Sequence, residues 1–407
     1  MDHLLEVGGI TESRADKRLI YFSSVPLQSY AQRPHFIVRA FADAGFDAVL
    51  WVDPYPTRLP SLSDLNRLFS RQPEIAHSDA EIQSYRPTAL PIEPLPLGNL
   101  INHLLCWRGA RRHLLEFSSA GTYCVIGIGR PSALSAWALE KLPHQRSFID
   151  VLDNFPAFYR GISRKSMSTR LEKTCTSVTD VFCSSSQLAR EISQIRKDAL
   201  VVLNGYPTDH LPPPSNISTR KYLGYIGTIG EWFDWPLVCE IARALPNVPV
   251  RLIGPEFVPR PQDLPPNVEL LGERPFSEMA DFVREFAVGL IPFRLNDLTS
   301  GVDPIKFYEY RSLGVPVWST NFGEMQQRGA DDGVAKIELG CNWQTLWKQA
   351  QTDLIEPQAV NDFREAVSWK RRFQPILERV AEPRPTHRGV PYDASDASNS
   401  FEKDSFS

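Results

Sequence analysis

The sequence predicts an α/β protein made of two doubly wound domains, each a parallel β-sheet covered by helices. Three observations predict this fold class. The chain has 407 residues, which is more than one hydrophobic core usually spans, so two domains of roughly 150 to 200 residues are expected. Short apolar runs alternate with helical patterns in both halves, as is typical of parallel sheets covered on both faces. A proline-rich stretch at 207–214 follows the turn dipeptide Asn204-Gly205 and suits a linker.

The first half opens with a βαβ unit. Residues 18–24 form a short apolar run that ends in small polar residues, which is typical of a buried strand followed by a turn. Residues 34–45 carry apolar side chains at helical spacing and end in Gly45, a plausible C-cap. A second strand follows at 48–52. The same pattern then predicts a strand at 123–127, a helix near 132–141 and a strand at 147–152.

The second half repeats this alternation after a further apolar run at 200–203. Strands are expected at 222–226, 249–253, 268–271, 287–292 and 315–319, with helices between them. A last helical stretch covers 360–380. Open α/β sheets bind their ligands beyond the carboxyl ends of the strands, so the strand-to-helix junctions are the places to search for function.

Composition and charge exclude several classes of protein. Lys plus Arg number 44 and Asp plus Glu 48, a net charge of -4, so no overall basic field indicates nucleic-acid binding. No apolar run approaches the roughly 18 residues of a membrane-spanning helix. The first 17 residues lack the apolar core of a signal peptide. We therefore expect a cytoplasmic protein, and leave open a peripheral attachment at the inner face of the membrane.

The six cysteines predict neither a zinc site nor a disulfide framework. They are spread along the chain without a C-x2-C pair or a neighbouring histidine cluster. We expect them to be reduced, and mostly buried as small apolar side chains.

The junction after the strand at 222–226 carries a glycine-rich turn. Gly227, Thr228 and Gly230 precede a helix that is expected to begin near Asp234 or Pro236. Glycines let the backbone approach a phosphate, and a helix start presents free N–H groups. A tight turn with Asp234 as the N-cap is the structural alternative, and the two interpretations are compatible. The turn is neither a G-x-G-x-x-G nor a Walker motif.

A second junction, 301–317, combines a helix with a following strand. Lys306 and Tyr310 are four residues apart and share a helix face, and Glu309 lies near the same stripe. The helix dipole disfavours a lysine at a helix N-terminus, and a nearby anion would explain it. A lysine–phosphate contact contributes about 1.5 to 3 kcal/mol. The alternative is an ordinary amphipathic helix on which Lys306 and Glu309 are solvated.

The pattern Pro304-x-Lys306-x-x-Glu309-Tyr310-x-x-x-Gly314-x-Pro316-Val317 resembles the nucleotide-sugar signature of GT-B glycosyltransferases. The turn at 227–234 and the segment Arg33-Pro34-His35 resemble bacterial cell-envelope and exopolysaccharide glycosyltransferases, such as those of teichuronic acid assembly and, more distantly, the xanthan glucuronosyltransferase. The similarity covers residues 18–375. It implies the GT-B fold, in which two Rossmann-like domains face each other across a cleft.

The resemblance implies a donor site for a UDP- or GDP-sugar on the second domain. Lys306 would contact the pyrophosphate, Glu309 the ribose and residues 227–229 the nucleotide. Arg294, just beyond the strand at 287–292, would add positive charge. The donor-site residues we expect are Gly227, Thr228, Ile229, Glu231, Arg294, Lys306, Glu309 and Tyr310.

One departure from the family pattern favours an inverting reaction. Retaining enzymes of this fold commonly carry two glutamates separated by seven residues, and the position that would pair with Glu309 is Gly301. The basic residues that often follow the first strand of the donor domain are also absent from 227–234. In the inverting branch a single carboxylate deprotonates the acceptor hydroxyl.

Asp153 is the expected general base. It stands where the strand at 147–152 ends, and it matches the position of the catalytic aspartate in the xanthan-type enzyme. A general base contributes about 10² to 10⁴ in rate. Asp153-Asn154 could instead cap the following turn. Asp150 is the reserve base, and His35, at a helix start, is either a further base, an acceptor contact or a structural residue.

No metal or other cofactor is expected, because Lys306, Arg294 and helix N–H groups can neutralise the departing diphosphate.

These observations divide the chain into five expected regions. They are a flexible N-terminus at 1–17, an acceptor-binding domain at 18–205, a nucleotide-sugar-binding domain at 206–359, a helix crossing back to the first domain at 360–381, and a disordered tail at 382–407.

The expected partners are the nucleotide-sugar donor and a saccharide or lipid-linked acceptor, without nucleic acid. The proline-rich segments 54–60 and 87–96 and the basic cluster 107–113 are suited either to a membrane surface or to ordinary solvent exposure. Two alternatives to a transferase stay open: a GT-B sugar-nucleotide epimerase, and a non-catalytic partner subunit that keeps the nucleotide pocket.

Overall fold

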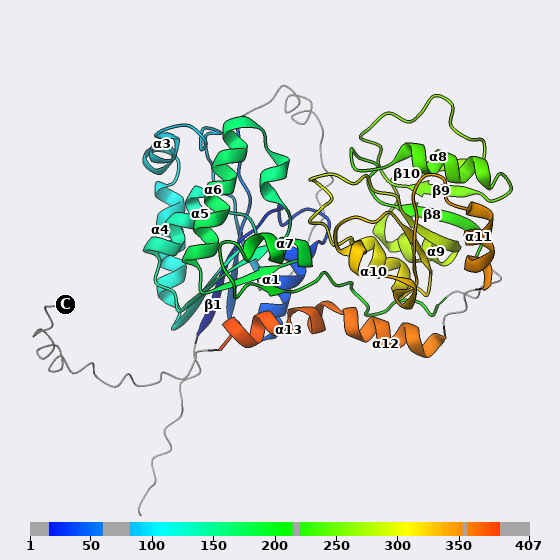
Figure 1. Ribbon diagram of the computed structural model, residues 1–407. Helices are drawn as coiled ribbons and strands as arrows, with labels where there is room; N and C mark the ends of the chain where they lie inside the picture. Colours follow the sequence, from blue (N-terminus) through cyan, green and yellow to red (C-terminus); the bar gives the residue numbers. More distant parts are fainter. Residues whose placement is uncertain (1–15, 60–81, 215–219, 353–355, 383–407) are drawn as a thin grey trace, which may run out of the picture.

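Two parallel β-sheets form two lobes of the molecule, which lie side by side in the computed structural model (Figure 1). The structure describes residues 16–59, 82–214, 220–352 and 356–382. The first sheet has seven strands in the order β3-β2-β1-β4-β5-β6-β7, and the second has six in the order β10-β9-β8-β11-β12-β13. Both sheets carry helices, so the prediction of two doubly wound α/β domains is confirmed.

The first domain contains residues of the first sheet and the helices between its strands. Its strands are β1 Lys17–Phe22, β2 Ala48–Val52, β3 Ile82–Tyr85, β4 Tyr123–Ile128, β5 Arg146–Val151, β6 Asp180–Cys183 and β7 Leu200–Val201. Its helices are α1 Arg33–Asp43, α3 Gly98–Leu105, α4 Arg108–Ala120, α5 Ala133–Lys141, the 3-10 helix η1 Phe155–Phe158, α6 Gly161–Ser177 and α7 Ser186–Ile192.

The second domain repeats this alternation. Its strands are β8 Tyr222–Ile226, β9 Val250–Ile253, β10 Val268–Gly272, β11 Phe286–Ile291, β12 Val317–Ser319 and β13 Val334–Lys336. Its helices are α8 Trp235–Ala244, α9 Met279–Arg284, α10 Ile305–Ser312 and α11 Trp343–Thr352, with 3-10 turns η3 Phe276–Glu278, η4 Gly323–Gln327 and η5 Ala330–Asp332. The chain then continues into α12 Pro357–Val367 and α13 Trp369–Val380.

Both faces of each sheet are buried, as the near-continuous apolar strands require. In β1, Ile20 and Phe22 pack on one face of the sheet, in a core cluster that also contains Leu114 of α4. Leu19 and Tyr21 point to the opposite face, where Phe41 of α1 belongs to the same cluster. The second domain has one large core built around β8 and β11.

The predicted C-terminal helix is two helices, so a single helix over 360–380 is wrong. The break lies at Ser368, whose side chain accepts a hydrogen bond from the Arg371 N–H and so caps α13. Helix α12 packs on α10 in the second domain, whereas α13 packs on α1, β5 and β6 in the first. Trp369 at the start of α13 stacks on Phe36 with ring centroids 5.0 Å apart. The pair of helices therefore runs beneath both lobes (Figure 1).

The chain order of the strands reverses at one place in each sheet. In the first sheet β1 has β2 on one side and β4 on the other, and in the second β8 lies between β9 and β11. Crevices beyond the carboxyl ends of the strands at such a reversal are the usual ligand sites of open α/β sheets. We therefore expect each domain to contribute to an interdomain site with the residues that follow its strands at this reversal.

Some expectations fall on residues outside the described ranges, namely most of the flexible N-terminus and nearly all of the C-terminal tail. Within the described ranges, no helix has the length and apolar character needed to cross a membrane. All six cysteines are unpaired thiols; four are buried, and Cys106 and Cys341 are half-buried.

Candidate active site

A cavity of about 540 Å³ lies between the two domains, beyond the carboxyl ends of both sheets. The first domain lines it with residues that follow β1, β4 and β5 and with the start of α1; the second contributes Trp232, Phe293 and the loop that leads into α10. Asp153 and Lys306 both line this cavity, one from each domain. The two residues that the sequence favoured for base and diphosphate contact therefore share one space.

Lys306 presents its ammonium group to the cavity. It is the second residue of α10, and its Nζ lies 5.2 Å from the centre of the Tyr225 ring and 5.5 Å from that of Phe293. Within the described part of the chain, no hydrogen bond or ion pair holds this ammonium. Burial lowers the pKa of Lys306, and the carboxylate of Glu309 opposes that shift. An ammonium that lies over aromatic rings and has no hydrogen-bond partner among the described residues is suited to bind an anion.

Gly227 makes room for Lys306. It begins the turn out of β8 with a φ of 128°, a left-handed conformation that favours glycine. A methyl group at Gly227 would lie 2.6 Å from Lys306 Nζ. The glycine-rich turn is therefore required for the position of the lysine as well as for its own backbone conformation.

Asp153 is half-buried and follows β5 into the cavity. Burial raises the pKa of its carboxyl to about 7, and the nearby Arg33 guanidinium limits the rise. No hydrogen bond or ion pair engages its carboxylate among the described residues. Asn154 is the N-cap of η1 but makes no side-chain cap bond, so the capping alternative for this pair has no support from the geometry. Asp153 is thus an acid whose proton exchanges near neutral pH.

Asp150 is held in an ion pair with Arg33, and this geometry argues against its reserve role as a base. It is fully buried, and both of its oxygens accept hydrogen bonds of 2.8 Å from Arg33, one from Nε and one from Nη2. Strand alternation explains the difference, because side chains three residues apart on β5 and its exit point to different sides. Asp150 holds Arg33 at the wall of the cavity, while Asp153 reaches the cavity itself.

His35 is structural, which corrects its candidate role as base or acceptor contact. It is the N3 residue of α1, and its Nδ1 accepts a hydrogen bond from the Gln32 N–H at 3.1 Å. Its Nε2 donates to the Leu27 carbonyl at 3.0 Å, and the ring packs on Trp51. Both ring nitrogens are therefore occupied in closing the helix start. His35 does not line the interdomain cavity.

Two of the predicted donor residues belong to the core. Tyr310 is fully buried, and its hydroxyl accepts a hydrogen bond of 3.0 Å from the Ile226 N–H at the end of β8. Ile229 is fully buried, its N–H donates to Pro255 and its carbonyl accepts from Phe257. Neither residue has a free group for a nucleotide, so both assignments are corrected.

The remaining donor residues lie around the cavity without lining it. Glu309, 7% exposed, accepts a hydrogen bond of 3.2 Å from the Tyr206 hydroxyl. Burial raises the pKa of Glu309 to about 7 despite the nearby Lys306. Thr228 is half-buried and its carbonyl accepts from the Tyr225 hydroxyl. Glu231 and Arg294 are exposed, and neither reaches the cavity wall.

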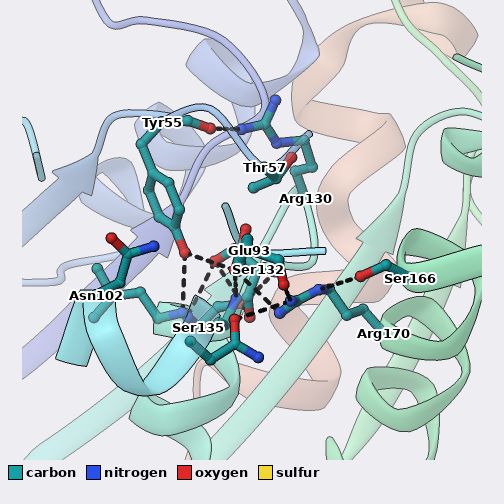
Figure 2. A network of polar contacts seen from close by, with 12 residues as sticks. Tyr55, Thr57, Glu93, Asn102, Arg130, Ser132, Ser135, Ser166 and Arg170 are labelled. Carbon is teal, nitrogen blue, oxygen red and sulfur yellow. Dashed lines mark hydrogen bonds and ion pairs between the residues drawn. The ribbon is translucent and has the colours of Figure 1, made fainter. Parts of the chain in front are cut away.

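Arg130 is a cavity residue that the sequence analysis missed. It follows β4 directly after Gly129, and its Nη2 donates to the Tyr55 carbonyl at 2.7 Å (Figure 2). Among the described residues, no carboxylate pairs with it. The signal was available, because the strand at 123–127 was predicted and Arg130 stands just past it at the strand-order reversal. Arg130 adds a second cation to the cavity, on the side of the first domain.

A buried polar network joins the two domains at the back of the cavity. Asp303 accepts hydrogen bonds from the Asn204 N–H at 2.7 Å and from Arg328 at 2.6 Å. The Asn204 side chain in turn accepts a hydrogen bond of 3.2 Å from Arg33, the partner of Asp150. Residues from α1, β5, the linker and the loop before α10 are therefore fixed relative to one another.

Gly301, the position of the missing first acid, lies at a domain contact. Its carbonyl accepts a hydrogen bond of 2.7 Å from the Ser185 hydroxyl of the first domain. A methyl group at Gly301 would lie 2.9 Å from a terminal carbon of Leu188. A larger side chain here would have to displace the Leu188 side chain of α7. The packing of Gly301 against Leu188 explains why the residue at position 301 is small.

The described residues contain no group of three or more His, Cys, Asp or Glu side chains placed to hold a metal ion. Of the charged residues that line the cavity, Arg33 and Asp303 are held in ion pairs. Lys306, Arg130 and Asp153 are the ones that a ligand can engage. Two cations and a carboxylate that is close to its pKa at neutral pH can bind an anionic leaving group and accept a proton.

Comparison with known proteins supports the same fold. No family model matches the chain. A curated protein of Bacillus subtilis (strain 168), named as a putative teichuronic acid biosynthesis glycosyltransferase, is 26% identical over an alignment of 174 residues. The match covers 39% of this chain and 43% of that protein. The match thus spans less than half the length of this relative.

Solved glycosyltransferase structures align with almost the whole chain. The catalytic domain of starch synthase IV from Arabidopsis thaliana, bound to ADP and acarbose, has a TM-score of 0.58 at 11% identity and covers 90% of this chain and 100% of its own. A glycosyltransferase from Rickettsia africae has a TM-score of 0.56 at 12% identity, with 90% and 98% coverage. Sucrose-phosphate synthase from Thermosynechococcus elongatus has a TM-score of 0.54 at 15% identity, with 89% and 96% coverage. The chain has the GT-B fold.

Proposed function

We propose that this chain is a glycosyltransferase that moves a sugar from a nucleoside diphosphate sugar to a saccharide acceptor of a cell-envelope polysaccharide. The GT-B fold and the weak relationship to a teichuronic acid glycosyltransferase support this class of activity. One observation carries the proposal. Asp153 and Lys306 line the same interdomain cavity from opposite domains, and no described protein group pairs with either side chain.

The donor diphosphate binds on the side of the second domain in this proposal. The Lys306 ammonium contacts the phosphate oxygens beside Gly227, and the free N–H groups at the start of α10 point toward the same charge. Arg130 faces them from the first domain. The protein itself supplies positive charge for the leaving diphosphate, so the proposed reaction uses no metal ion.

The acceptor binds on the side of the first domain, with Asp153 as general base. The Asp153 carboxylate takes the proton of an acceptor hydroxyl, and the acceptor oxygen bonds to the anomeric carbon of the sugar. The bond from that carbon to the diphosphate oxygen breaks on the opposite side, and the nucleoside diphosphate leaves. The configuration at the anomeric carbon inverts. A carboxyl whose pKa is about 7 is well matched to this role near neutral pH.

The test begins with the donor. Purified protein is incubated with UDP-, GDP- and ADP-sugars, and the unfolding temperature is followed, because a ligand that binds only the folded form raises it. The stabilising donor is then mixed with saccharide acceptors, and nucleoside diphosphate release and the anomeric configuration of the product are measured. We expect release that depends on acceptor, and an inverted product.

Two variants separate the parts of the site. Lys306→Ala should abolish most of the donor-induced stabilisation, whereas Asp153→Asn should keep it and lose turnover. An isomerised sugar nucleotide formed without acceptor would indicate an epimerase instead. Donor binding with no release in the presence of any acceptor would indicate a non-catalytic subunit.

A further inference from the structure

Helix α3 is amphipathic with its apolar side outward. Leu97, Leu100, Ile101, Leu104 and Leu105 recur at helical spacing and are 37 to 73% exposed. The polar Asn102 on the opposite side is fully buried and exchanges two hydrogen bonds with the main chain of Leu90. Figure 1 shows α3 at the outer edge of the first domain, away from the second lobe. A row of exposed leucines on an ordered helix indicates a surface that binds something apolar.

The segment before α3 is held firmly to the domain by a buried acid. Glu93 is 2% exposed, pairs with Arg170 of α6 at 3.0 Å and accepts a hydrogen bond of 3.2 Å from the Tyr55 hydroxyl (Figure 2). Arg170 also donates to the Asn99 side chain in the first turn of α3. The apolar helix is therefore fixed in place by interactions on its inner side, and its leucines stay exposed.

A groove of about 980 Å³ separates α3 from α6 and carries basic side chains. Asn99 and His103 of α3 form one wall, and Lys165 and Lys173 of α6 line the other. No described carboxylate pairs with either lysine, while Glu140 at the end of the groove pairs with Lys141. An exposed arginine, Arg108, begins α4 just beyond α3. Leu95 and Ile162, which are 40% and 61% exposed, line the same groove, so apolar and unpaired cationic groups lie next to each other there.

We propose that α3 and this groove dock the protein on an anionic phospholipid membrane. The leucines of α3 enter the boundary between headgroups and acyl chains, and Lys165 and Lys173 contact lipid phosphates. Amphipathic helices with basic flanks bind anionic lipid surfaces in this way, by apolar burial together with charge attraction. Charge complementarity decides the occupant, because a purely apolar partner would leave the two lysines unpaired. This inference does not depend on the proposed transferase activity.

The experiment is co-sedimentation of the full chain with vesicles, without donor or acceptor. Vesicles of phosphatidylglycerol and phosphatidylcholine are compared with vesicles of phosphatidylcholine alone. We expect binding to the anionic vesicles only. The double variant Leu104→Ser, Leu105→Ser should bind about tenfold or more weakly, and Lys165→Gln should bind about fivefold more weakly. Added salt should weaken the wild type more than the lysine variant.

The matched control is Phe257→Ser with Leu339→Ser. These residues of the second domain are 75% and 57% exposed, so the control removes comparable apolar surface away from α3 and should bind vesicles like the wild type. Equal unfolding temperatures establish that the α3 variants are folded. The proposal is overturned if the wild type fails to sediment with anionic vesicles or if the control loses as much binding as the α3 variant. A dimer in solution that the leucine variant dissociates would also overturn it, since a second copy would then cover this face.

Discussion

The Lys306 ammonium lies so close to Gly227 that a methyl group added at this glycine would be 2.6 Å from Nζ. The contact joins the first turn of α10 to the end of β8. It links two motifs, 227–234 and 301–317, that are some seventy residues apart in the sequence. The donor half of the proposed site therefore depends on the absence of a side chain as much as on the presence of a charge.

Gly227→Ala is expected to weaken donor binding, because the methyl group displaces Lys306. The apparent affinity for nucleoside diphosphate should fall about tenfold, the loss of one charged hydrogen bond of about 1.5 kcal/mol. Titration calorimetry with the stabilising nucleotide measures it. Gly272→Ala is the matched control, since Gly272 also has a positive φ, 67°, but no atom near the added methyl. If both variants lose affinity equally, backbone strain and not the lysine is responsible.

Asp153→Asn is expected to reduce turnover by about 10² to 10⁴ while donor affinity stays within about twofold. The amide has the same shape as the acid but cannot take a proton. Steady-state release of nucleoside diphosphate and the donor dissociation constant are measured on the same preparation. Undiminished turnover in this variant would remove Asp153 as the base.

The rate is expected to rise with pH through about 7, where Asp153 loses its proton, and then to level off. The base must be ionised to act, so the active form lies on the high-pH side. Glu309 also titrates at about 7, and Glu309→Gln is therefore the control. The pH profile of kcat should be unchanged in that variant, and a profile that became flat would assign the titration to Glu309 instead.

The same carboxyl should make the folded state less stable as pH rises. Because the pKa of Asp153 is raised from 3.8 to about 7 by burial, the folded chain binds more protons than the unfolded chain in that interval, and the free energy of unfolding falls with pH. Above pH 7 Asp153→Asn should thus unfold at a higher temperature than the wild type. The difference should shrink as pH falls toward 4, and a constant difference would contradict the raised pKa.

Asp150→Asn is expected to destabilise the first domain by about 3 to 5 kcal/mol, because it leaves the buried Arg33 guanidinium without its partner. Urea unfolding measures the free energy. Asp180→Asn is the comparison, since that carboxylate is also buried but its partners Arg146 and Arg379 are more exposed than Arg33. A folded, fully stable Asp150→Asn variant that had lost only turnover would return Asp150 to the list of bases.

Most strands were predictable, but β3, β6 and β13 were not. β6 is buried, yet its four residues begin with an acid and form too short an apolar run to indicate a strand. β1, β4, β8 and β11 are buried on both faces and are apolar along nearly their whole length, so the sequence marks them. β3 is an edge strand with two exposed residues, and β13 has only three residues. Short edge strands need no apolar run, because one neighbour and one covered face suffice to hold them.

The residues of the candidate site were also only partly predictable. Asp153 and Lys306 were predicted because each stands at the end of an element that the sequence marks, and such ends face the cleft in a parallel sheet. Tyr310 and Ile229 lie in the same motifs, yet they point into the core. One helix or turn presents residues to both the cleft and the core, and spacing along the chain does not say which face is which.

The alternation of strands and helices can be read from the sequence alone, and with it the edge of each sheet where a ligand site is expected. Tertiary structure decided which polar side chains reach that edge. Asp150 is held by Arg33, which is 117 residues away in the chain, and Tyr310 is held by the end of β8, 84 residues away. Contacts of this kind form only when distant segments pack together. Local periodicity indicates which residues are buried and which share a helix face. The hydrogen-bond or ion-pair partner of a polar group depends on the three-dimensional packing.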